Sequence, residues 1–284
     1  MPIKGIRGFK DILPGEVEKW QFVEGEARRI FGLFGFSELR IPILERTELF
    51  SRSIGESSDI VGKEMYTFPD RDGDSLTLRP EATTSIMRAY LEHNLYLKEP
   101  VGKYYFIGPM FRYERPQKGR YRQFHQIDVE ILGVQEPQAD AEILVMLMRY
   151  LAGVGIKKVS LQINSLGCPA CRLPYKGEIQ KFLRTKSEGL CEDCQRRLET
   201  NPLRVFDCKK EDCQAHLTAA PVVLDFLCPD CRRHFDRVKT LLDGLDLAYS
   251  VNPRMVRGLD YYTRTAFEVI TGELGAQNAV CGGG

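Results

Sequence analysis

The chain has 284 residues and a formal net charge of +1, with 43% hydrophobic and 28% charged residues. This length allows one large domain, or a large domain with a smaller one inserted in it. The sequence has no run of 18 apolar residues, and Met1 to Lys10 lacks the apolar core of a signal peptide. We therefore expect a cytoplasmic protein with no membrane partner. Because the charges nearly balance, a basic surface that binds nucleic acid must be local.

The first predicted elements are a helix and a strand. Apolar residues recur at helical spacing from about Pro14 to Phe34. Gly35 permits a stop, and residues 36–44 alternate like a strand. Pro42 cannot donate to a ladder, so this strand should lie at a sheet edge or pair irregularly. Its apolar surroundings favour an interface.

Strands and helices alternate in the following hundred residues. Met65 to Phe68 and Leu76 to Leu78 predict a hairpin whose turn, Asp70 to Asp74, contains a glycine. The further predicted strands are 104–107, 110–113, 124–132 and 159–163, and the predicted helices are 83–94 and 139–151.

Composition changes after Asn164. Residues from Cys168 to about Phe235 are rich in Cys, Arg and Lys and poor in strand pattern, and a helix over Val238 to Leu245 and strand-like sequence from Tyr249 follow. We predict an α+β fold in which an antiparallel sheet flanked by helices, residues 1–165 and 240–284, is interrupted by a small Cys-rich domain at 166–239.

A basic loop lies between two predicted strands. The stretch from Lys103 to His125 contains six Lys/Arg and one acid, Glu114, and residues 115–122 have the Pro and Gly of a loop. Arginine suits phosphate because its planar fork makes two parallel hydrogen bonds. The loop therefore either contacts phosphate or nucleic acid, or is a solvated basic loop.

The strand after this loop has two distinct faces. His125, Ile127, Val129 and Ile131 fall on one face, and Gln126, Asp128 and Glu130 fall on the other. The polar face either meets water or lines a site. Its position directly after the basic loop favours a ligand with a positive amine and an attached phosphate.

The segment Arg257-Gly-Leu-Asp-Tyr-Tyr262 is a third candidate for part of a binding site, after the basic loop and the two-faced strand. The glycine after Arg257 permits close backbone approach to a ligand. We expect the two adjacent tyrosines to lie on a strand and to point to opposite faces, so that one at most lines a pocket while the other packs.

Cysteines form close pairs in the 166–239 region. Eight thiols suit one or two tetrahedral Zn²⁺ sites, and inert buried thiols are the alternative. The pairs are Cys168/Cys171, Cys191/Cys194, Cys208/Cys213 and Cys228/Cys231. Cys281 is unpaired and has no assigned role.

Four segments together resemble histidyl-tRNA synthetases of class II, over essentially the whole chain. Residues 35–42 resemble motif 1, and Phe111 to Gln126 is similar to motif 2 in its histidine-specific form. Leu78-Arg-Pro-Glu-Ala-Thr83 and residues 257–262 match the two histidine-specific signatures. The resemblance implies a homodimer formed through motif 1.

The resemblance also implies a role for individual residues. Arg112 and Arg257 would hold the α-phosphate from two sides as the catalytic pair. The histidine-binding residues would be Glu81, Thr83, Gln126, Glu130, Tyr261 and Tyr262. Glu114 and Arg120 would contact ATP, and Gln117 would contact the tRNA acceptor end.

The implied reaction is attack of the histidine carboxylate on the α-phosphorus of ATP, with Mg²⁺ on the other phosphates, followed by transfer of histidine to tRNA(His). The family's motif 3 and anticodon-binding domain are missing after Gly284, so we expect a truncated form. One rival is a histidine-binding paralogue without catalysis, such as the regulatory subunit of ATP phosphoribosyltransferase. The other is a zinc-dependent nucleic-acid-binding module.

Overall fold

The computed structural model describes residues 2–55, 60–116, 119–257, 261–273 and 278–284. The chain forms two compact units, each made of two segments of the sequence. The first unit comprises Met1–Gln135 and Met146–Ile156, and the second comprises Glu136–Val145 and Lys157–Gly284. Among the described residues, no helix is long and apolar enough to span a membrane.

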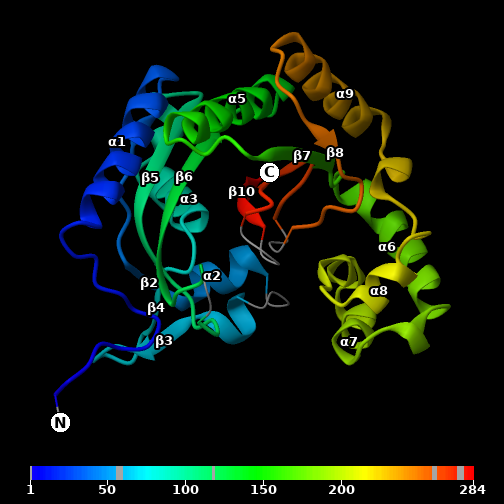
Figure 1. Ribbon diagram of the computed structural model, residues 1–284, viewed down its shortest axis with the longest axis horizontal. Helices are drawn as coiled ribbons and strands as arrows, with labels where there is room; N and C mark the ends of the chain where they lie inside the picture. Colours follow the sequence, from blue (N-terminus) through cyan, green and yellow to red (C-terminus); the bar gives the residue numbers. More distant parts are fainter. Residues whose placement is uncertain (1, 56–59, 117–118, 258–260, 274–277) are drawn as a thin grey trace. The chain divides into compact units, whose positions relative to one another are not determined.

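Two long strands, β5 (Gly102–Phe111) and β6 (Gln123–Leu132), form the main sheet of the first unit (Figure 1). They pair antiparallel along their whole length, and the two-residue β1 (Ser37–Glu38) pairs parallel to β5 at the edge. We predicted two strands where β5 is continuous. Pro109 is tolerated inside β5 because β1 contacts only Tyr104 and Tyr105 on the other side.

Each face of this sheet packs against a helix. On the odd-numbered face, Phe31 of α1 (Val17–Leu33) lies 5.4 Å from the ring of Tyr105 and 5.6 Å from that of Tyr150. On the even-numbered face, α3 (Thr83–Glu92) packs against the sheet, as Figure 1 shows. The buried core on this side consists of Ile41, Ala82, Ile86, Ala89, Tyr90, Tyr104, Phe106, Met110 and Leu132. On β6, the ring of His125 contacts Trp20 of α1, and Glu130 accepts a hydrogen bond from Thr83 of α3, so odd- and even-numbered residues lie on opposite faces as predicted.

The predicted hairpin forms a second, smaller sheet of three antiparallel strands. Its order is β2 (Leu44–Arg46), β4 (Ser75–Leu78) and β3 (Tyr66–Pro69). The carboxylate of Asp70 accepts hydrogen bonds of 2.9 Å from the backbone N–H groups of Asp72 and Asp74, which closes the turn. Short helical segments complete this unit: α2 (Thr47–Ile54), the π-helix Ile60–Glu64 and α4 (Leu95–Lys98).

The strand predicted at 36–44 is interrupted around Pro42. Residues 39–43 lie between β1 and β2 and belong to neither strand. The buried Arg79 guanidinium donates to the carbonyl oxygens of Ile41, Pro42 and Pro109 instead. We predicted one strand over residues 36–44 that would lie at a sheet edge or pair irregularly. The structure instead has two short strands, β1 and β2, each at the edge of its own sheet, with no strand at residues 39–43.

The second unit contains a four-stranded sheet and a helical region. The strand order is β10 (Ala279–Gly283), β9 (Thr265–Ile270), β7 (Ser160–Ser165) and β8 (Ser250–Val251). Between β7 and β8 the chain forms α6 (Pro169–Arg184), α7 (Glu192–Thr200), α8 (Glu211–His216) and α9 (Pro229–Gly244), with 3₁₀ segments at Ser187–Gly189, Pro202–Asp207 and Val223–Phe226. The 17-residue α5 (Pro137–Gly153) contributes to both units.

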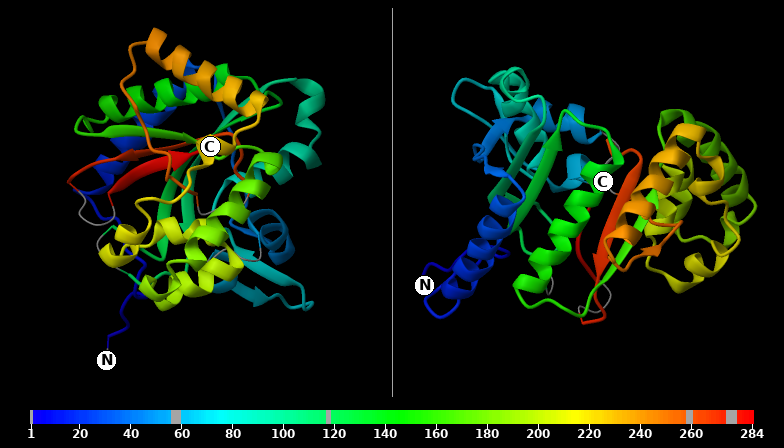
Figure 2. Two further views of the ribbon diagram at one scale, coloured as in Figure 1. Left: turned by 90° about the vertical axis from the view of Figure 1, so that its right-hand side faces the viewer. Right: turned by 90° about the horizontal axis from the view of Figure 1, so that it is seen from above.

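Helix α9 begins at Pro229, earlier than the predicted start at Val238. Proline is favoured in the first turn of a helix because its missing N–H is not needed there. The sheet of this unit brings together strands that are distant in sequence, drawn in green (β7) and in orange to red (β9 and β10) in Figure 2. All of residues 166–239 are described, and none of them is in a strand.

Candidate active site and cysteine clusters

Three carboxylates gather on the even-numbered face of the main sheet in the first unit. Asp128 and Glu130 lie on β6, and Glu81 precedes α3 and is 2% exposed. The hydroxyl of Thr83 donates to Glu130 Oε1 over 2.6 Å, and the backbone N–H of Thr84 donates to Glu81 Oε1 over 3.0 Å. We call Glu81, Asp128 and Glu130 the acid cluster.

The acid cluster is electrostatically strained. Burial raises the pKa of Glu130 to about 7, against the opposing effect of the Thr83 hydrogen bond. Burial, and then the charges of Glu130 and Glu81, raise the pKa of Asp128 well above its usual range. Among the described residues, Gln126 Oε1 and Asp128 Oδ2 are buried without a hydrogen-bond partner. Carboxylates that disfavour each other's ionisation, beside unsatisfied oxygens, form a site suited to a cation.

Arg112 lies next to this cluster at the end of β5. Its Nε donates to the carbonyl of Pro80 over 2.8 Å, and its guanidinium lies 5.3 Å from the centre of the Phe124 ring. Burial lowers the pKa of Arg112, while the charges of Glu114 and Glu81 counteract it. The side chain is held in place by groups that leave its positive charge available to an anion.

The loop after Arg112 is only partly described. Glu114 forms an ion pair with Arg120. The Arg122 guanidinium lies 3.9 Å from the centre of the Tyr113 ring, and its Nε donates to the Glu114 carbonyl. Gln117, a predicted site residue, lies outside the described residues.

Arg257 is anchored in the second unit. Its Nη1 forms an ion pair of 2.9 Å with Glu268 of β9, and its guanidinium lies 5.6 Å from the centre of the Tyr262 ring. Gly282, the register partner of Glu268, leaves space for this arginine, because a Cβ there would lie 2.7 Å from Arg257 Nη1. The structure places Arg257 in a different unit from Arg112.

The expectation that Tyr261 and Tyr262 point to opposite faces of a strand is wrong. These residues lie in a turn and an irregular segment, and their ring centres are 4.9 Å apart. Side chains alternate only where the backbone is extended, and it is not in a strand here.

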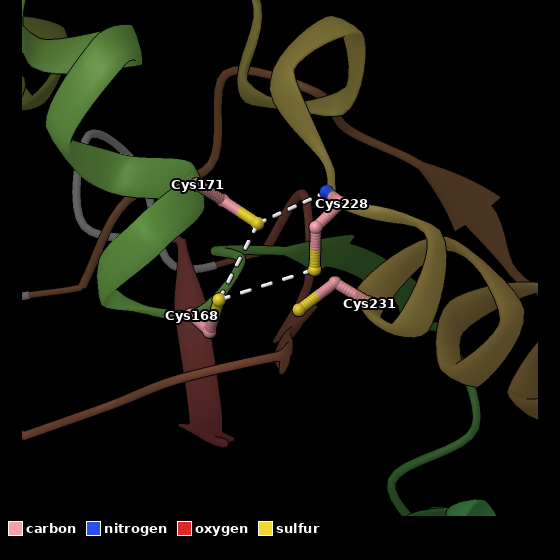
Figure 3. A group of neighbouring side chains, drawn as sticks. All are labelled: Cys168, Cys171, Cys228 and Cys231. Carbon is pink, nitrogen blue, oxygen red and sulfur yellow. Dashed lines mark hydrogen bonds between the residues drawn. The ribbon is translucent and has the colours of Figure 1, made fainter.

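The eight paired cysteines form two separate groups within the second unit. Cys168, Cys171, Cys228 and Cys231 form the outer cluster (Figure 3), and Cys191, Cys194, Cys208 and Cys213 form the inner cluster. Within each cluster all four sulfur atoms lie within 4.8 Å of one another. The cysteines are free thiols. The sequence suggested one or two metal sites and did not indicate which pairs combine.

Several residues that shape these sites were not predicted. Asp128 was recognised on the polar strand face but not as a site residue. Glu268 and Gly282 position Arg257. This role is visible only in the structure, where the two residues are paired across β9 and β10. Arg79 was part of a recognised motif, but its hydrogen bonds to three carbonyls could not be read from the sequence.

Comparison with known proteins identifies the family. A family model for histidyl-tRNA synthetase matches residues 8–284. The histidine–tRNA ligase of Geobacter sulfurreducens is 58% identical over 282 residues, which are 99% of this chain and 68% of that protein. The ligase of Syntrophotalea carbinolica is 57% identical over 284 residues, with coverage of 100% and 68%. The chain thus spans about two-thirds of the length of these relatives.

Solved structures agree. The chain matches apo histidyl-tRNA synthetase from S. aureus with a TM-score of 0.78 at 38% identity, covering 100% of this chain and 66% of that one. An ATP phosphoribosyltransferase regulatory subunit/histidyl-tRNA synthetase from Bacillus halodurans C gives a TM-score of 0.73 at 18% identity, covering 100% and 76%, and so shares the fold. The predicted α+β class II fold and the predicted family are confirmed: this chain belongs to the histidyl-tRNA synthetases.

Proposed function

We propose that this chain carries the histidine-activating site of a histidine–tRNA ligase. The reaction joins histidine to ATP as histidyl-adenylate, releases pyrophosphate, and then transfers histidine to tRNA(His). The acid cluster beside Arg112 is the observation that carries the proposal, because it offers opposite charges to the two ends of an aminoacyl-adenylate. The close relatives named histidine–tRNA ligase support the same activity.

The acid cluster would bind the histidine ammonium group. A positive ligand relieves the mutual repulsion of Glu81, Asp128 and Glu130, and it supplies donors for oxygens that are otherwise unsatisfied. Thr83 would fix the orientation of Glu130 through its 2.6 Å hydrogen bond. Gln126 lies on the same strand face and would contribute its amide.

Arginines would stabilise the reacting phosphate. Arg112 would hold the α-phosphate, and Arg257 would lie across the histidine carboxylate and that phosphate. The attacking carboxylate is already ionised, so this step needs orientation and charge stabilisation but no general base. Mg²⁺ would enter with ATP and neutralise its outer phosphates. Glu114 would lie near adenine and Arg120 near the phosphates.

Tyr261 and Tyr262 would close the imidazole pocket, and Gln117 would reach the tRNA acceptor end. A pocket that hydrogen-bonds imidazole nitrogens discriminates strongly, because an apolar rival leaves buried polar groups unpaired. The two tyrosine rings contact each other, and the Arg257 guanidinium lies over the Tyr262 ring, which supports a common side of the imidazole pocket formed by these three residues.

The proposal also covers the domain organisation, the location in the cell and the oligomeric state of the protein. We infer a catalytic domain of residues 1–165 and 240–284 with an inserted domain at 166–239 that holds structural Zn²⁺. We also infer a cytoplasmic homodimer formed through motif 1. In support of the dimer, the adjacent apolar residues Ile43 and Leu44, which directly follow motif 1, expose 46% and 41% of their surface.

Histidine-dependent exchange of pyrophosphate into ATP tests the activity. A parent enzyme that includes the further third of the relatives' length should exchange rapidly, and its Arg112→Ala variant should lose about 100-fold or more of the rate. A matched variant, Arg149→Ala, removes an arginine that lies 5.6 Å from the centre of the Phe34 ring and is outside the proposed site, and it should exchange normally. Histidine binding without exchange in the parent would instead support a paralogue without catalysis.

A further inference from the structure

We propose that the inserted region holds two Zn²⁺ ions, one in the outer cluster and one in the inner cluster, and that the two ions have different structural tasks. The outer ion links the two ends of the insertion to each other, and the inner ion completes the core of the insertion. This inference rests on the zinc part of the proposed function and is independent of ligase activity.

The sulfur geometry in both clusters fits a single tetrahedral ion. In the outer cluster, Cys168 Sγ lies 3.6 Å from Cys171 Sγ and 4.0 Å from Cys228 Sγ. In the inner cluster, Cys191 Sγ lies 3.9 Å from Cys208 Sγ. Four thiolates about 2.3 Å from one zinc ion are separated by about 3.8 Å along each edge of the tetrahedron. These spacings exceed the ~2.05 Å of a disulfide and match a shared metal ion.

Both clusters also contain the supporting contacts that thiolate ligands need. The backbone N–H of Cys228 donates to Cys171 Sγ over 3.1 Å, and that of Cys191 donates to Cys213 Sγ over 3.2 Å. Cys168 and Cys228 are the N-cap residues of the 16-residue helices α6 and α9. The positive ends of these helices therefore face the negative charge of a four-thiolate zinc site.

The outer cluster joins segments that are 60 residues apart, at the base of the insertion. Cys168 follows β7 closely, and the intervening backbone is tied to the segment before β9 by hydrogen bonds from Leu166 N–H to the Arg264 carbonyl and from Arg264 N–H to the Gly167 carbonyl. Gly167 is required at this point, because a Cβ there would lie 2.6 Å from Cys171 Cβ. Figure 3 shows the four cysteines reaching one another from α6 and α9. An ion at this position holds the start and the end of the insertion together, directly after β7.

The inner cluster lies within the hydrophobic core of the insertion. Cys194, Cys208 and Cys213 belong to one buried group of twelve residues, of which the others are Tyr175, Ile179, Leu183, Leu190, Leu198, Val205, Leu217, Ala220 and Val223. A core of this size in about 70 residues is small for an independently stable domain, and small domains commonly need a metal or a disulfide. An ion here supplies the missing cross-links.

The test is metal analysis of the full chain purified without added metal. We expect two zinc ions per chain. Cys168→Ser with Cys171→Ser, and Cys191→Ser with Cys194→Ser, should each retain one ion. Cys281→Ser, which removes the thiol outside both clusters, should retain two. Hydrogen exchange should increase across residues 190–217 in the inner variant, and around the start of α6 and α9 in the outer variant.

Three results would overturn the proposal: one zinc or fewer per chain in a folded protein, iron in place of zinc, or loss of both ions from each double variant. If a variant does not fold, the parent chain decides the question. After metal removal it should take up two equivalents of Co²⁺ with the absorption of a tetrahedral thiolate site, and uptake of one equivalent would refute two sites. If the longer parent enzyme binds both zinc ions but does not exchange pyrophosphate into ATP, the proposed ligase activity is wrong and the two zinc sites stand.

Discussion

Replacing Glu130 with Gln should stabilise the fold at alkaline pH and weaken histidine binding at the same time. Burial raises the pKa of this carboxyl from 4.5 to about 7. At about 1.36 kcal/mol per pKa unit, ionised Glu130 then costs the folded state on the order of 3 kcal/mol at pH 8. Glutamine removes this charge, and its side-chain oxygen still accepts the hydrogen bond from Thr83.

The sign of the pH dependence follows from the raised pKa. The folded state binds the proton of Glu130 more tightly than the unfolded state does, so the parent's stability falls as pH rises from about 4.5 to about 7. The stability advantage of Glu130→Gln should therefore be absent near pH 4, grow through this window, and be complete at pH 8. Repulsion from Glu81 acts in the same direction as burial.

Urea unfolding at pH 5 and pH 8 measures the stability difference, and calorimetric titration with histidine at pH 8 measures the affinity. A hydrogen bond to a charged group contributes about 1.5–3 kcal/mol, so the dissociation constant should rise by roughly 10- to 150-fold. Glu92→Gln is the matched control, because Glu92 lies on α3 with a side chain that is 59% exposed. A variant that is less stable than the parent at pH 8, or that binds histidine normally, would refute the reasoning.

Three other changes test separate parts of the proposed site. Arg257→Ala in the longer parent should reduce pyrophosphate exchange by about 100-fold with an unchanged circular dichroism spectrum, and an undiminished rate would contradict its role. Gly282→Ala forces a Cβ to within 2.7 Å of Arg257 Nη1, so unfolding titration should show a loss of about 1–3 kcal/mol, while Gly244→Ala, where a Cβ meets nothing within 4 Å, should show none. Leu44→Asp should convert a dimer to a monomer in light scattering, whereas Leu173→Asp, at a residue that is 77% exposed on α6, should not.

The regular elements of the first unit could be predicted because local patterns determine them. The hairpin around Asp70 to Asp74 and the two-faced strand β6 are confirmed, since turn residues and alternation with a period of two are local signals. The strand predicted over residues 36–44 is interrupted at residues 39–43, where the Arg79 guanidinium donates to the carbonyls of Ile41 and Pro42, a contact between distant segments that the local pattern does not contain. The start of α9 was predicted too late, because residues 229–237 are mostly polar and their helical state depends on packing around Cys231 and Phe235.

The pairing of the cysteines is the clearest example of information that is absent from local sequence. Spacing identified four pairs, and eight thiols in four pairs can be combined into two sites in three ways. The structure combines the first pair with the fourth and the second with the third. In this nested arrangement the helices between Cys171 and Cys228 bring the end of the insertion back to its start. Such a contact depends on residues far apart in the sequence, so a local pattern cannot predict it.

The geometry around Arg257 shows the same dependence on partners from distant segments. Its motif identified the arginine, but the motif contains neither the carboxylate that orients it nor the space that it occupies. Glu268 supplies the carboxylate and Gly282 supplies the space, and the two are register partners across β9 and β10. Gly282 thus leaves room for an arginine that we propose to be catalytic, because it has no side chain. Its substitution should therefore damage the proposed reaction without removing any group that touches the substrate.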